Sequence, residues 1–167
     1  IKTAQYELVK RYSGMLMSVC RRYVSDEPTA KDILQESLIR IFKNIDGYKS
    51  IGSFEGWIRK ITVRCALGYL NKKHVRCESS VADINIDEPT SPLALDNLGV
   101  EDIIKLVQEL PPGFRSVFNL NAIEGYSHKE ISKMLGITES ASRSQLTRAR
   151  KLLQKKYREI NVKYKSA

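Results

Sequence analysis

The C-terminal part of the chain gathers side chains that bind nucleic acid rather than side chains that catalyse a reaction. Between residues 140 and 158 there are seven arginines and lysines and no acidic residue. Lysine and arginine neutralise phosphates, and an arginine can also donate two hydrogen bonds to the edge of one guanine. The net charge of +9 agrees with a nucleic-acid partner, although charge alone does not establish one. This run predicts a duplex-binding segment; a helical hairpin with an ordinary solvated face is the alternative.

A second basic segment combines positive charge with aromatic rings. Residues 57–76 contain no acidic residue, and Tyr48, Phe54, Trp57 and Tyr69 bracket or interrupt the run. Lysine and arginine side chains bind phosphates, and aromatic rings stack on unpaired nucleotide bases. This combination therefore favours single-stranded or opened nucleic acid. The alternative is a solvated face over an aromatic core, and we expect Trp57 itself to pack because it is in phase with the apolar stripe. The basic residues are Arg59, Lys60, Arg64, Lys72, Lys73 and Arg76.

Local signals place the C-terminal basic run on the second helix of a helix-turn-helix. Ser127 and Glu130 fit a capping box, in which the serine oxygen accepts from the Glu130 amide and the carboxylate reaches back. Gly136 supplies a turn, and Thr138 suits the N-cap of the next helix. The second helix of such a motif enters the major groove with its N-terminal end. Its inward face is expected to hold Ala141, Leu146, Ala149, Leu153 and Tyr157.

The N-terminal half predicts three more helices, because apolar residues recur there at three- and four-residue steps. The stripes run over residues 8–23, over residues 30–45, and from residue 54 to about residue 70. Gly47 and Gly52 break the pattern before the third stripe. No alternating strand pattern competes, so the predicted fold class is all-α.

An acidic segment separates the two basic modules. From Glu78 to Asp102 there are seven acidic residues, two prolines and no lysine or arginine. This composition favours a flexible linker, whereas a long loop inside one domain is the alternative. We therefore expect two small helical domains, 1–77 and 101–167, joined by an acidic linker at 78–100.

The composition also bears on location. No apolar run approaches the ~20 residues that a membrane span requires. No signal-peptide pattern is present, although the chain opens with Ile1 rather than Met, so residues can precede it. Cys20, Cys65 and Cys77 lack the paired spacing of a metal site or a disulfide framework. The expected location is the reducing cytoplasm.

Five segments carry a family resemblance: "AKDILQESLIRIFKNI", "FEGWIRKI", "LPPGFRSVFNL", "EGYSHKEISKMLGI" and "SRSQLTRARKLL". Together they resemble the sigma-70 family of RNA polymerase sigma factors, in particular its small extracytoplasmic-function (ECF) group. The segment "AKDILQESLIRIFKNI" is similar to the conserved helix of region 2, and "FEGWIRKI" to the signature that follows it. The segments "LPPGFRSVFNL", "EGYSHKEISKMLGI" and "SRSQLTRARKLL" resemble region 4. They stand in the family's order and cover nearly the whole chain. The resemblance implies a region 2 helical bundle, a short linker and a region 4 helix-turn-helix.

The resemblance implies a function without catalysis. A sigma factor binds core RNA polymerase, brings it to a promoter and helps to open the duplex at the −10 element. Docking is expected on the clamp helices of the β′ subunit and on the β flap, with the linker threading the polymerase channels. An anti-sigma factor is a further expected partner; no cofactor, metal or membrane insertion is expected. The residues expected to bind core polymerase are Asp32, Gln35, Glu36 and Arg40.

The DNA contacts are also assigned by resemblance. The loop 47–53 and the third helix would open the −10 element, and the helix-turn-helix would read the −35 element. The expected −10 residues are Tyr48, Lys49, Ser50, Arg59, Lys60, Arg64, Asn71, Lys72 and Lys73. The expected −35 residues are Ser140, Arg143, Ser144, Thr147, Arg148 and Lys151.

Four positions depart from the family pattern. Arg64 stands where relatives often carry asparagine, and Gly68 where many carry aspartate or asparagine, which leaves the −10 preference open. Ser142 replaces a usual valine, which is expected to loosen the packing slightly. Gln145 replaces a usual arginine and could pair with adenine.

Two other classes of protein remain as alternatives. One is a stand-alone regulator with a helix-turn-helix and a helical sensor domain, against which the "AKDILQES" segment argues. The other is a metalloprotein or nucleic-acid enzyme built around Cys65, His74 and Cys77. His74 and Cys77 form only half of a zinc site, and no nucleotide-binding loop or nucleophile motif accompanies them.

Overall fold

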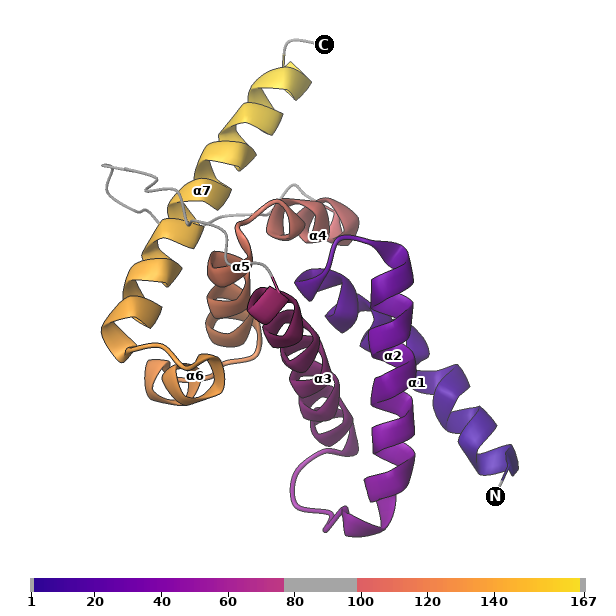
Figure 1. Ribbon diagram of the computed structural model, residues 1–167. Coiled ribbons are helices and arrows are strands. Elements are labelled where there is room, and N and C mark those ends of the chain that lie inside the picture. Colours follow the sequence, from indigo (N-terminus) through magenta and orange to yellow (C-terminus); the bar gives the residue numbers. More distant parts are fainter. Residues whose placement is uncertain (1, 77–98, 166–167) are drawn as a thin grey trace. The chain divides into compact units, whose positions relative to one another are not determined.

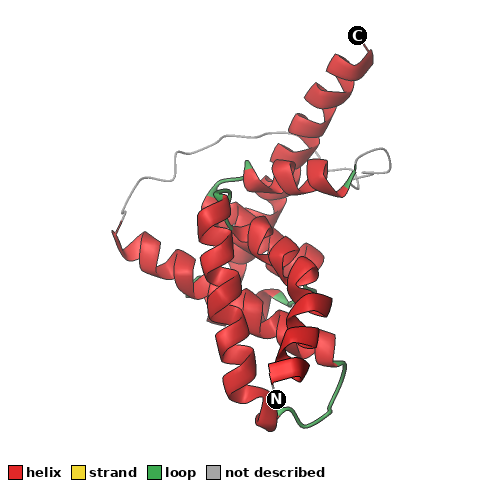
Figure 2. Ribbon diagram, turned by 90° about the vertical axis from the view of Figure 1, so that its right-hand side faces the viewer, coloured by secondary structure: helices red, strands yellow, loops and turns green. Residues whose placement is uncertain are grey.

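Helices make up all the regular structure of the described chain. The computed structural model describes residues 2–76 and 99–165. Within these ranges the helices are joined by turns and loops, and no strand occurs (Figure 1; Figure 2). The predicted all-α fold class is therefore confirmed for this part of the chain.

The chain divides into two compact units, Ile1–Ser79 and Ser80–Ala167. The division falls inside the predicted linker, of which residues 78–98 lie outside the described part. The last two residues of the predicted linker 78–100 begin a helix: Gly99 is its N-cap and Val100 its first residue.

The first unit is a three-helix bundle. Its elements are α1 (Lys2–Tyr23), α2 (Glu27–Asn44), the short 3-10 turn η1 (Ile45–Gly47) and α3 (Phe54–Arg76) (Figure 1). Each α-helix packs against the other two. Leu16, Ile41 and Ile58, one from each helix, are fully buried at the centre. The apolar stripes of the sequence thus meet in one core.

Helix α3 is longer than its apolar stripe predicts. The stripe ends near Leu70, whereas the helix continues to Arg76. Asn71 and Lys72 in this extension are exposed, so hydrophobic periodicity carries no signal for it. Lysine is nevertheless a good helix former, which favours continuation of the helix.

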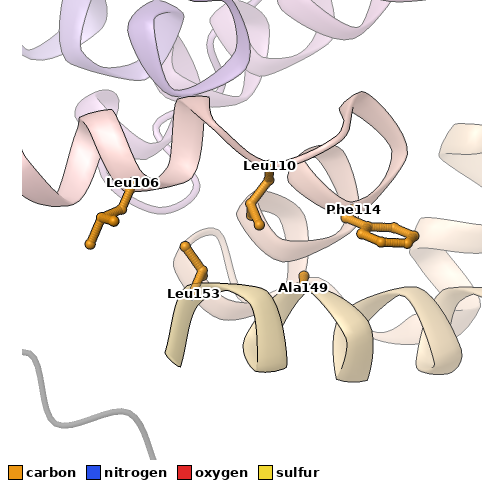
Figure 3. Packing of buried hydrophobic residues seen from close by; sticks show 5 residues of the cluster. All are labelled: Leu106, Leu110, Phe114, Ala149 and Leu153. Atoms are coloured by element: carbon orange, nitrogen blue, oxygen red, sulfur yellow. The ribbon is translucent and has the colours of Figure 1, made fainter. Parts of the chain in front are cut away.

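The second unit packs short helices against one long helix. Its elements are α4 (Val100–Gln108), α5 (Pro112–Phe118), the π-helical η2 (Asn119–Ile123), α6 (His128–Leu135) and α7 (Glu139–Lys165). Figure 3 shows the core that joins α4, α5 and α7. Its buried members are Leu106, Leu110, Phe114, Ala149 and Leu153.

A partly buried arginine connects the end of α4 to α5. Arg115 Nη2 donates to the carbonyl oxygen of Leu110 at 2.9 Å, and the guanidinium also donates to the carbonyl oxygen of Gln108. The last carbonyls of a helix lack amide partners within the helix and carry partial negative charge, so a guanidinium satisfies them well. Burial lowers the pKa of Arg115 from its ordinary value, yet an arginine remains charged at neutral pH.

Helix α5 runs directly into the π-helical segment η2. The Glu124 amide donates to the carbonyl oxygen of Asn119 at 2.9 Å, and the Tyr126 amide to that of Leu120 at 2.9 Å. These bonds span five and six residues instead of the four of an α-helix. Gly125 has a φ of +78°, a left-handed conformation that glycine adopts readily and that ends this helix. The wider turn has no signal in the sequence.

Candidate nucleic-acid interface

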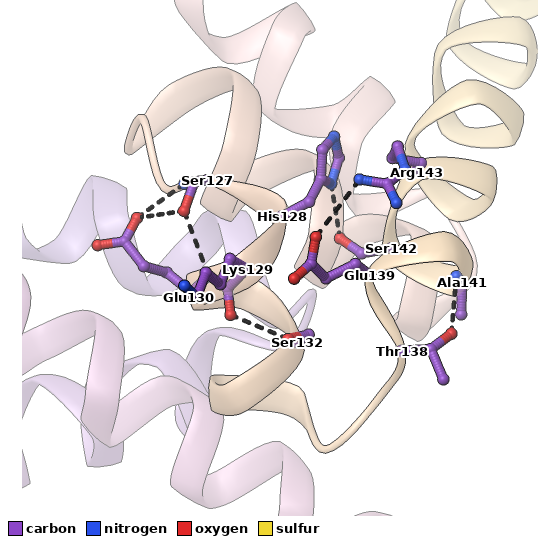
Figure 4. Close-up of polar contacts among 10 residues, drawn as sticks. All are labelled: Ser127, His128, Lys129, Glu130, Ser132, Thr138, Glu139, Ala141, Ser142 and Arg143. Atoms are coloured by element: carbon purple, nitrogen blue, oxygen red, sulfur yellow. Dashed lines mark hydrogen bonds and ion pairs between the residues drawn. The ribbon is translucent and has the colours of Figure 1, made fainter.

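The start of α6 carries the predicted capping box. Glu130 N donates to Ser127 Oγ at 3.3 Å, and Ser127 N donates to Glu130 Oε2 at 2.9 Å (Figure 4). Two amides that would otherwise lack partners are satisfied reciprocally. Ile131 is fully buried and anchors the helix. The capping box is therefore confirmed.

The turn between α6 and α7 has the expected chemistry. Gly136 is left-handed, with φ 67° and ψ 32°, and its amide donates to the carbonyl oxygen of Ser132. Thr138 Oγ1 accepts from the Ala141 amide at 3.0 Å (Figure 4). Both the glycine turn and the threonine cap are as predicted. Together they direct α7 away from α6 as the second helix of a helix-turn-helix.

One face of the first turns of α7 is open to solvent. Ser140, Arg143, Ser144 and Thr147 are exposed, at steps of three and four residues. Arg148 and Lys151 are half-buried at its border. The opposite face holds the buried residues Ser142, Leu146, Ala149 and Leu153. The six residues predicted for the −35 element therefore lie on or beside one surface.

Two departures from the family pattern have explanations in the structure. Ser142 is fully buried, and its Oγ lies 2.8 Å from His128 Nδ1, so a specific hydrogen bond accompanies the smaller side chain. Gln145 is half-buried, and its Oε1 lies 3.3 Å from where a Cβ would stand on Gly113. Gln145 thus packs toward α5, at the edge of the exposed face.

Helix α3 exposes a stripe without acidic side chains. Lys60, Arg64, Asn71 and Lys72 are exposed, and Gly68 lies between them on the same side. The predicted site residues of α3 thus share a surface, with two exceptions. Arg59 is half-buried, with Nη2 4.0 Å from Glu55 Oε1. The side chain of Lys73 lies outside the described part.

The loop before α3 rests on an aromatic cluster. The Tyr48 ring centroid lies 5.3 Å from those of Phe54 and Trp57. Tyr48 Oη donates to the carbonyl oxygen of Gly52 at 2.8 Å. Tyr48 therefore supports the loop from a half-buried position, and Trp57 packs on the core as expected.

The tip of this loop is open to solvent. Lys49, Ser50 and Ile51 are exposed, and Ile51 reaches 84%. Ser50 has a φ of 55° and Gly52 a φ of 82°; the first conformation is uncommon for a residue with a side chain. Sequence reasoning did not single out Ile51, because one isoleucine between polar residues and glycines has no periodic context.

Helix α2 presents a polar face. Asp32, Gln35, Glu36 and Arg40 are all exposed, at steps of three and four residues. Arg40 Nε donates to Glu36 Oε1 at 2.6 Å, and this hydrogen bond raises the pKa of Arg40. Ile39 shares the face and is 43% exposed. Two of these side chains are acidic and repel phosphates, so this face suits a protein partner better than DNA.

The cysteines offer no reactive site in the described residues. Cys20 and Cys65 are buried, and burial raises the pKa of Cys20 from 9.0 to about 12. Cys77 lies outside the described part, as does the side chain of His74. Among the described residues, no group of three or more His, Cys, Asp or Glu side chains could hold a metal ion. No described helix is long and apolar enough to span a bilayer.

Two sequence families match the chain, one in each unit. Residues 8–76 match sigma-70 region 2, and residues 101–153 match sigma-70, region 4. The two matches stand in the family's order and together cover most of the chain. The chain belongs to the sigma-70 family. The resemblance inferred from the motifs is thereby confirmed.

Sigma factors of the ECF group are similar to the chain. It is 30% identical over 152 residues to ECF sigma factor SigE of Mycolicibacterium smegmatis, covering 88% of this chain and 59% of that protein. It is 28% identical over 163 residues to the ECF sigma-E factor of Escherichia coli K12, covering 89% and 84%. The chain thus spans less than two thirds of the first relative and most of the second.

Two solved structures share the fold. One is RpoE of Bartonella quintana, in complex with the anti-sigma factor NepR, with a TM-score of 0.55 and 19% identity over 93% of this chain and 96% of that one. The other is CnrH, in complex with the cytosolic domain of CnrY, with a TM-score of 0.50 and 21% identity over 95% and 90%.

Proposed function

We propose that this chain is an ECF-type sigma factor that binds core RNA polymerase and directs promoter-specific initiation of transcription. The observation that carries the proposal is the presence of both regions, 2 and 4, on one chain. A stand-alone regulator needs the helix-turn-helix but has no use for region 2. The protein would act in the cytoplasm as a specificity subunit, with no catalytic site of its own.

The exposed face of α7 is proposed to read the −35 element. Arg143 stands near the N-terminal end of the helix, which is the end that enters the major groove. Its guanidinium can read a guanine edge, while Arg148 and Lys151 at the border suit phosphates. Ser140, Ser144 and Thr147 complete this surface.

The first unit is proposed to open the −10 element. The stripe on α3 supplies positive charge for the phosphates of a separated strand. The loop 48–53 stands on rings that are packed among themselves, so we assign those rings to support. The exposed tip, with Lys49 and Ser50, is then the part that meets an unpaired base.

The polar face of α2 is proposed to dock on core polymerase, with an anti-sigma factor as a competing partner. Support for the second part comes from the structural relative RpoE, which was solved with a bound anti-sigma factor. Nothing in this chain identifies that regulator by chemistry, so the docking on polymerase is the part to test first.

Charge reversal at Glu36 tests the docking. Glu36→Lys should weaken co-elution with bacterial core RNA polymerase on gel filtration at moderate salt, because it removes one exposed carboxylate and repels a basic partner. The fold should persist, since an exposed ion pair contributes only ~0–1 kcal/mol. Glu55→Lys is the matched control: Glu55 is also exposed and is also paired with an arginine four residues later.

The outcomes separate the two candidate functions. Co-elution that Glu36→Lys weakens and Glu55→Lys retains supports an initiation subunit. Failure of the wild-type chain to bind an active core, with duplex binding retained, would instead indicate a stand-alone regulator.

A further inference from the structure

A hydrogen bond joins the two helices of the helix-turn-helix. His128 is the first residue of α6, and Ser142 lies in the first turn of α7. His128 Nδ1 and Ser142 Oγ are 2.8 Å apart although the residues are 14 positions apart in the sequence (Figure 4). The serine is fully buried and the histidine half-buried. The bond therefore spans the turn at Gly136 and is shielded from water on the serine side.

The serine has a local alternative that it does not use. A buried hydroxyl on a helix can donate to the carbonyl oxygen four residues earlier. Ser116 does so in the same unit, with Oγ 2.9 Å from the carbonyl oxygen of Pro112. Ser142 could satisfy its hydroxyl at Thr138 in the same way, yet it bonds to a different helix. The His128 bond is thus not required to satisfy the hydroxyl, and its distinct effect is to relate α7 to α6.

The bond acts beside the residues that face DNA. Ser142 immediately precedes Arg143 and Ser144, which are exposed. Neighbouring residues of a helix point about 100° apart, so a rotation of α7 that moves Ser142 must also move Arg143. On the other side of the bond, α6 is held by its capping box and by buried Ile131. Helix α6, which is held in place, therefore sets the rotation of α7 about its own axis through this hydrogen bond.

We propose that His128 is a positioning residue for duplex recognition, which acts through Ser142 to set the direction of Arg143. The proposal rests on the proposed function in one respect, namely that α7 reads a duplex. Loss of the bond leaves the unit folded, because Ser142 can turn to the Thr138 carbonyl oxygen, but it leaves α7 less strictly oriented. Discrimination between DNA sequences then falls more than affinity for DNA in general.

The test uses the full chain assembled with bacterial core RNA polymerase. The wild-type holoenzyme first selects duplexes from a randomised pool, and a selected duplex and its shuffled version are the two probes. The variants are His128→Leu, which removes the bond, and His128→Asn, whose amide can reach near the place of Nδ1. Ser116→Ala is the matched control, because it removes a buried serine whose bond stays within one helix.

We expect His128→Leu to lower the ratio of affinities, selected over shuffled, about tenfold, which corresponds to the loss of about one hydrogen bond. His128→Asn should recover most of the ratio, and Ser116→Ala should leave it unchanged. An unchanged ratio in His128→Leu would overturn the proposal. So would an equal loss with the leucine and the asparagine variant, since that would indicate a requirement for the ring rather than for the bond.

A second measurement does not depend on DNA. In the free full chain, amide hydrogen exchange in the first turn of α7 should be faster in His128→Leu than in wild type. In His128→Asn it should be slower than in His128→Leu. Equal exchange in all three would overturn the proposed connection between the helices. If the wild-type holoenzyme selects no duplex at all, the proposed function fails, and amide exchange alone decides whether His128 orients α7.

Discussion

Arg143 is exposed and forms a weak ion pair with Glu139, which a DNA contact can replace. Its Nη1 lies 3.5 Å from Glu139 Oε2, one turn earlier on α7 (Figure 4). Surface pairs of this kind are worth ~0.3–0.5 kcal/mol, so a phosphate or a guanine edge can replace the carboxylate at little cost. Glu139 meanwhile carries a negative charge in the first turn, where it stabilises the helix. The pair holds the guanidinium near the N-terminal end of α7 without fixing it there.

Arg143→Ala should weaken binding of a −35 duplex to the holoenzyme by about 1–3 kcal/mol, the usual cost of losing a base contact. The melting temperature of the chain should hardly change, because the side chain is exposed. Competition binding with a labelled duplex measures the loss. Lys133→Ala is a control with the same change in charge, since Lys133 is exposed on α6. Equal losses for both variants would show that total charge, and not the position of Arg143, determines binding.

The burial of Cys20 makes the stability of the folded chain depend on pH above about pH 9. Burial raises its pKa from 9.0 to about 12, and the Cys65 thiol nearby adds to the rise. The unfolded chain releases this proton near pH 9, whereas the folded chain keeps it until about pH 12. The folded state therefore binds more protons in that window, and stability falls as pH rises from 9 toward 12. Below pH 9 the contribution is complete.

Thiol labelling tests the state of the buried cysteines. In a Cys77→Ser background at pH 8, a thiol reagent should modify Cys20 and Cys65 only after denaturant has unfolded the chain, because the reactive species is the thiolate. Mass spectrometry of the native and the unfolded samples measures the extent. Rapid modification of either cysteine in the native chain would contradict their burial.

At the scale of elements, two glycines have opposite roles. Gly136 is left-handed at the end of α6, whereas Gly14 lies in the interior of α1, and no heavy atom would crowd a Cβ at either position. The difference between them is therefore the backbone conformation alone. A side chain is disfavoured at a φ of +67° and favoured inside a helix.

Gly136→Ala should lower the free energy of unfolding of the second unit by about 1 kcal/mol, whereas Gly14→Ala should raise that of the first by about 0.5–1 kcal/mol. Trp57 is the only tryptophan of the chain, so its fluorescence reports the first unit, and circular dichroism follows the loss of helix overall. An unchanged midpoint with Gly136→Ala would show that the left-handed turn is not needed in solution.

Local chemistry explains which elements were predictable from the sequence. The capping box, Gly136 and Thr138 act within four residues, so their types and spacing indicate α6 and the start of α7 directly. The polar end of α3 was missed because its sequence has no apolar residues at a helical period. The hydrogen bond between His128 and Ser142 was missed for another reason: it depends on the distance between two helices, which no spacing along the chain encodes.

At the scale of the whole chain, charge is unevenly distributed. Residues 78–102 hold seven acidic residues and no lysine or arginine. The remainder of the chain therefore carries all 28 lysine and arginine residues against 19 − 7 = 12 acidic residues. This excess predicts binding to DNA that depends strongly on salt, because each neutralised phosphate releases counterions.

The logarithm of duplex affinity should fall linearly with the logarithm of salt concentration. If Arg143, Arg148 and Lys151 each meet a phosphate, the second unit contributes a slope of about −3. Lys151→Ala should make the slope about one unit shallower, while Lys133→Ala should leave it unchanged. A titration of binding across salt concentrations measures this; a slope near zero for the wild type would contradict an electrostatic interface.

The assignment of the family from sequence succeeded because two modules could be recognised together. Either half alone would have admitted other readings, since basic helical hairpins and polar helix faces are common. The arrangement of side chains within each half was less predictable. Packing against neighbours holds Tyr48 and Gln145 half-buried, for example. Side-chain burial of this kind depends on the tertiary core, and residue type alone does not reveal it.

The π-helical segment between α5 and α6 has a consequence for how such chains change over evolutionary time. A turn with one residue more than an α-helical turn is what a single inserted codon leaves behind when both flanking helices keep their packing. Asn119 and Leu120 remain buried on one side of it, while Ala122 and Ile123 are exposed on the other. We therefore expect homologous proteins to differ in length by one residue at this point, and to do so without altering the capped helix pair that follows.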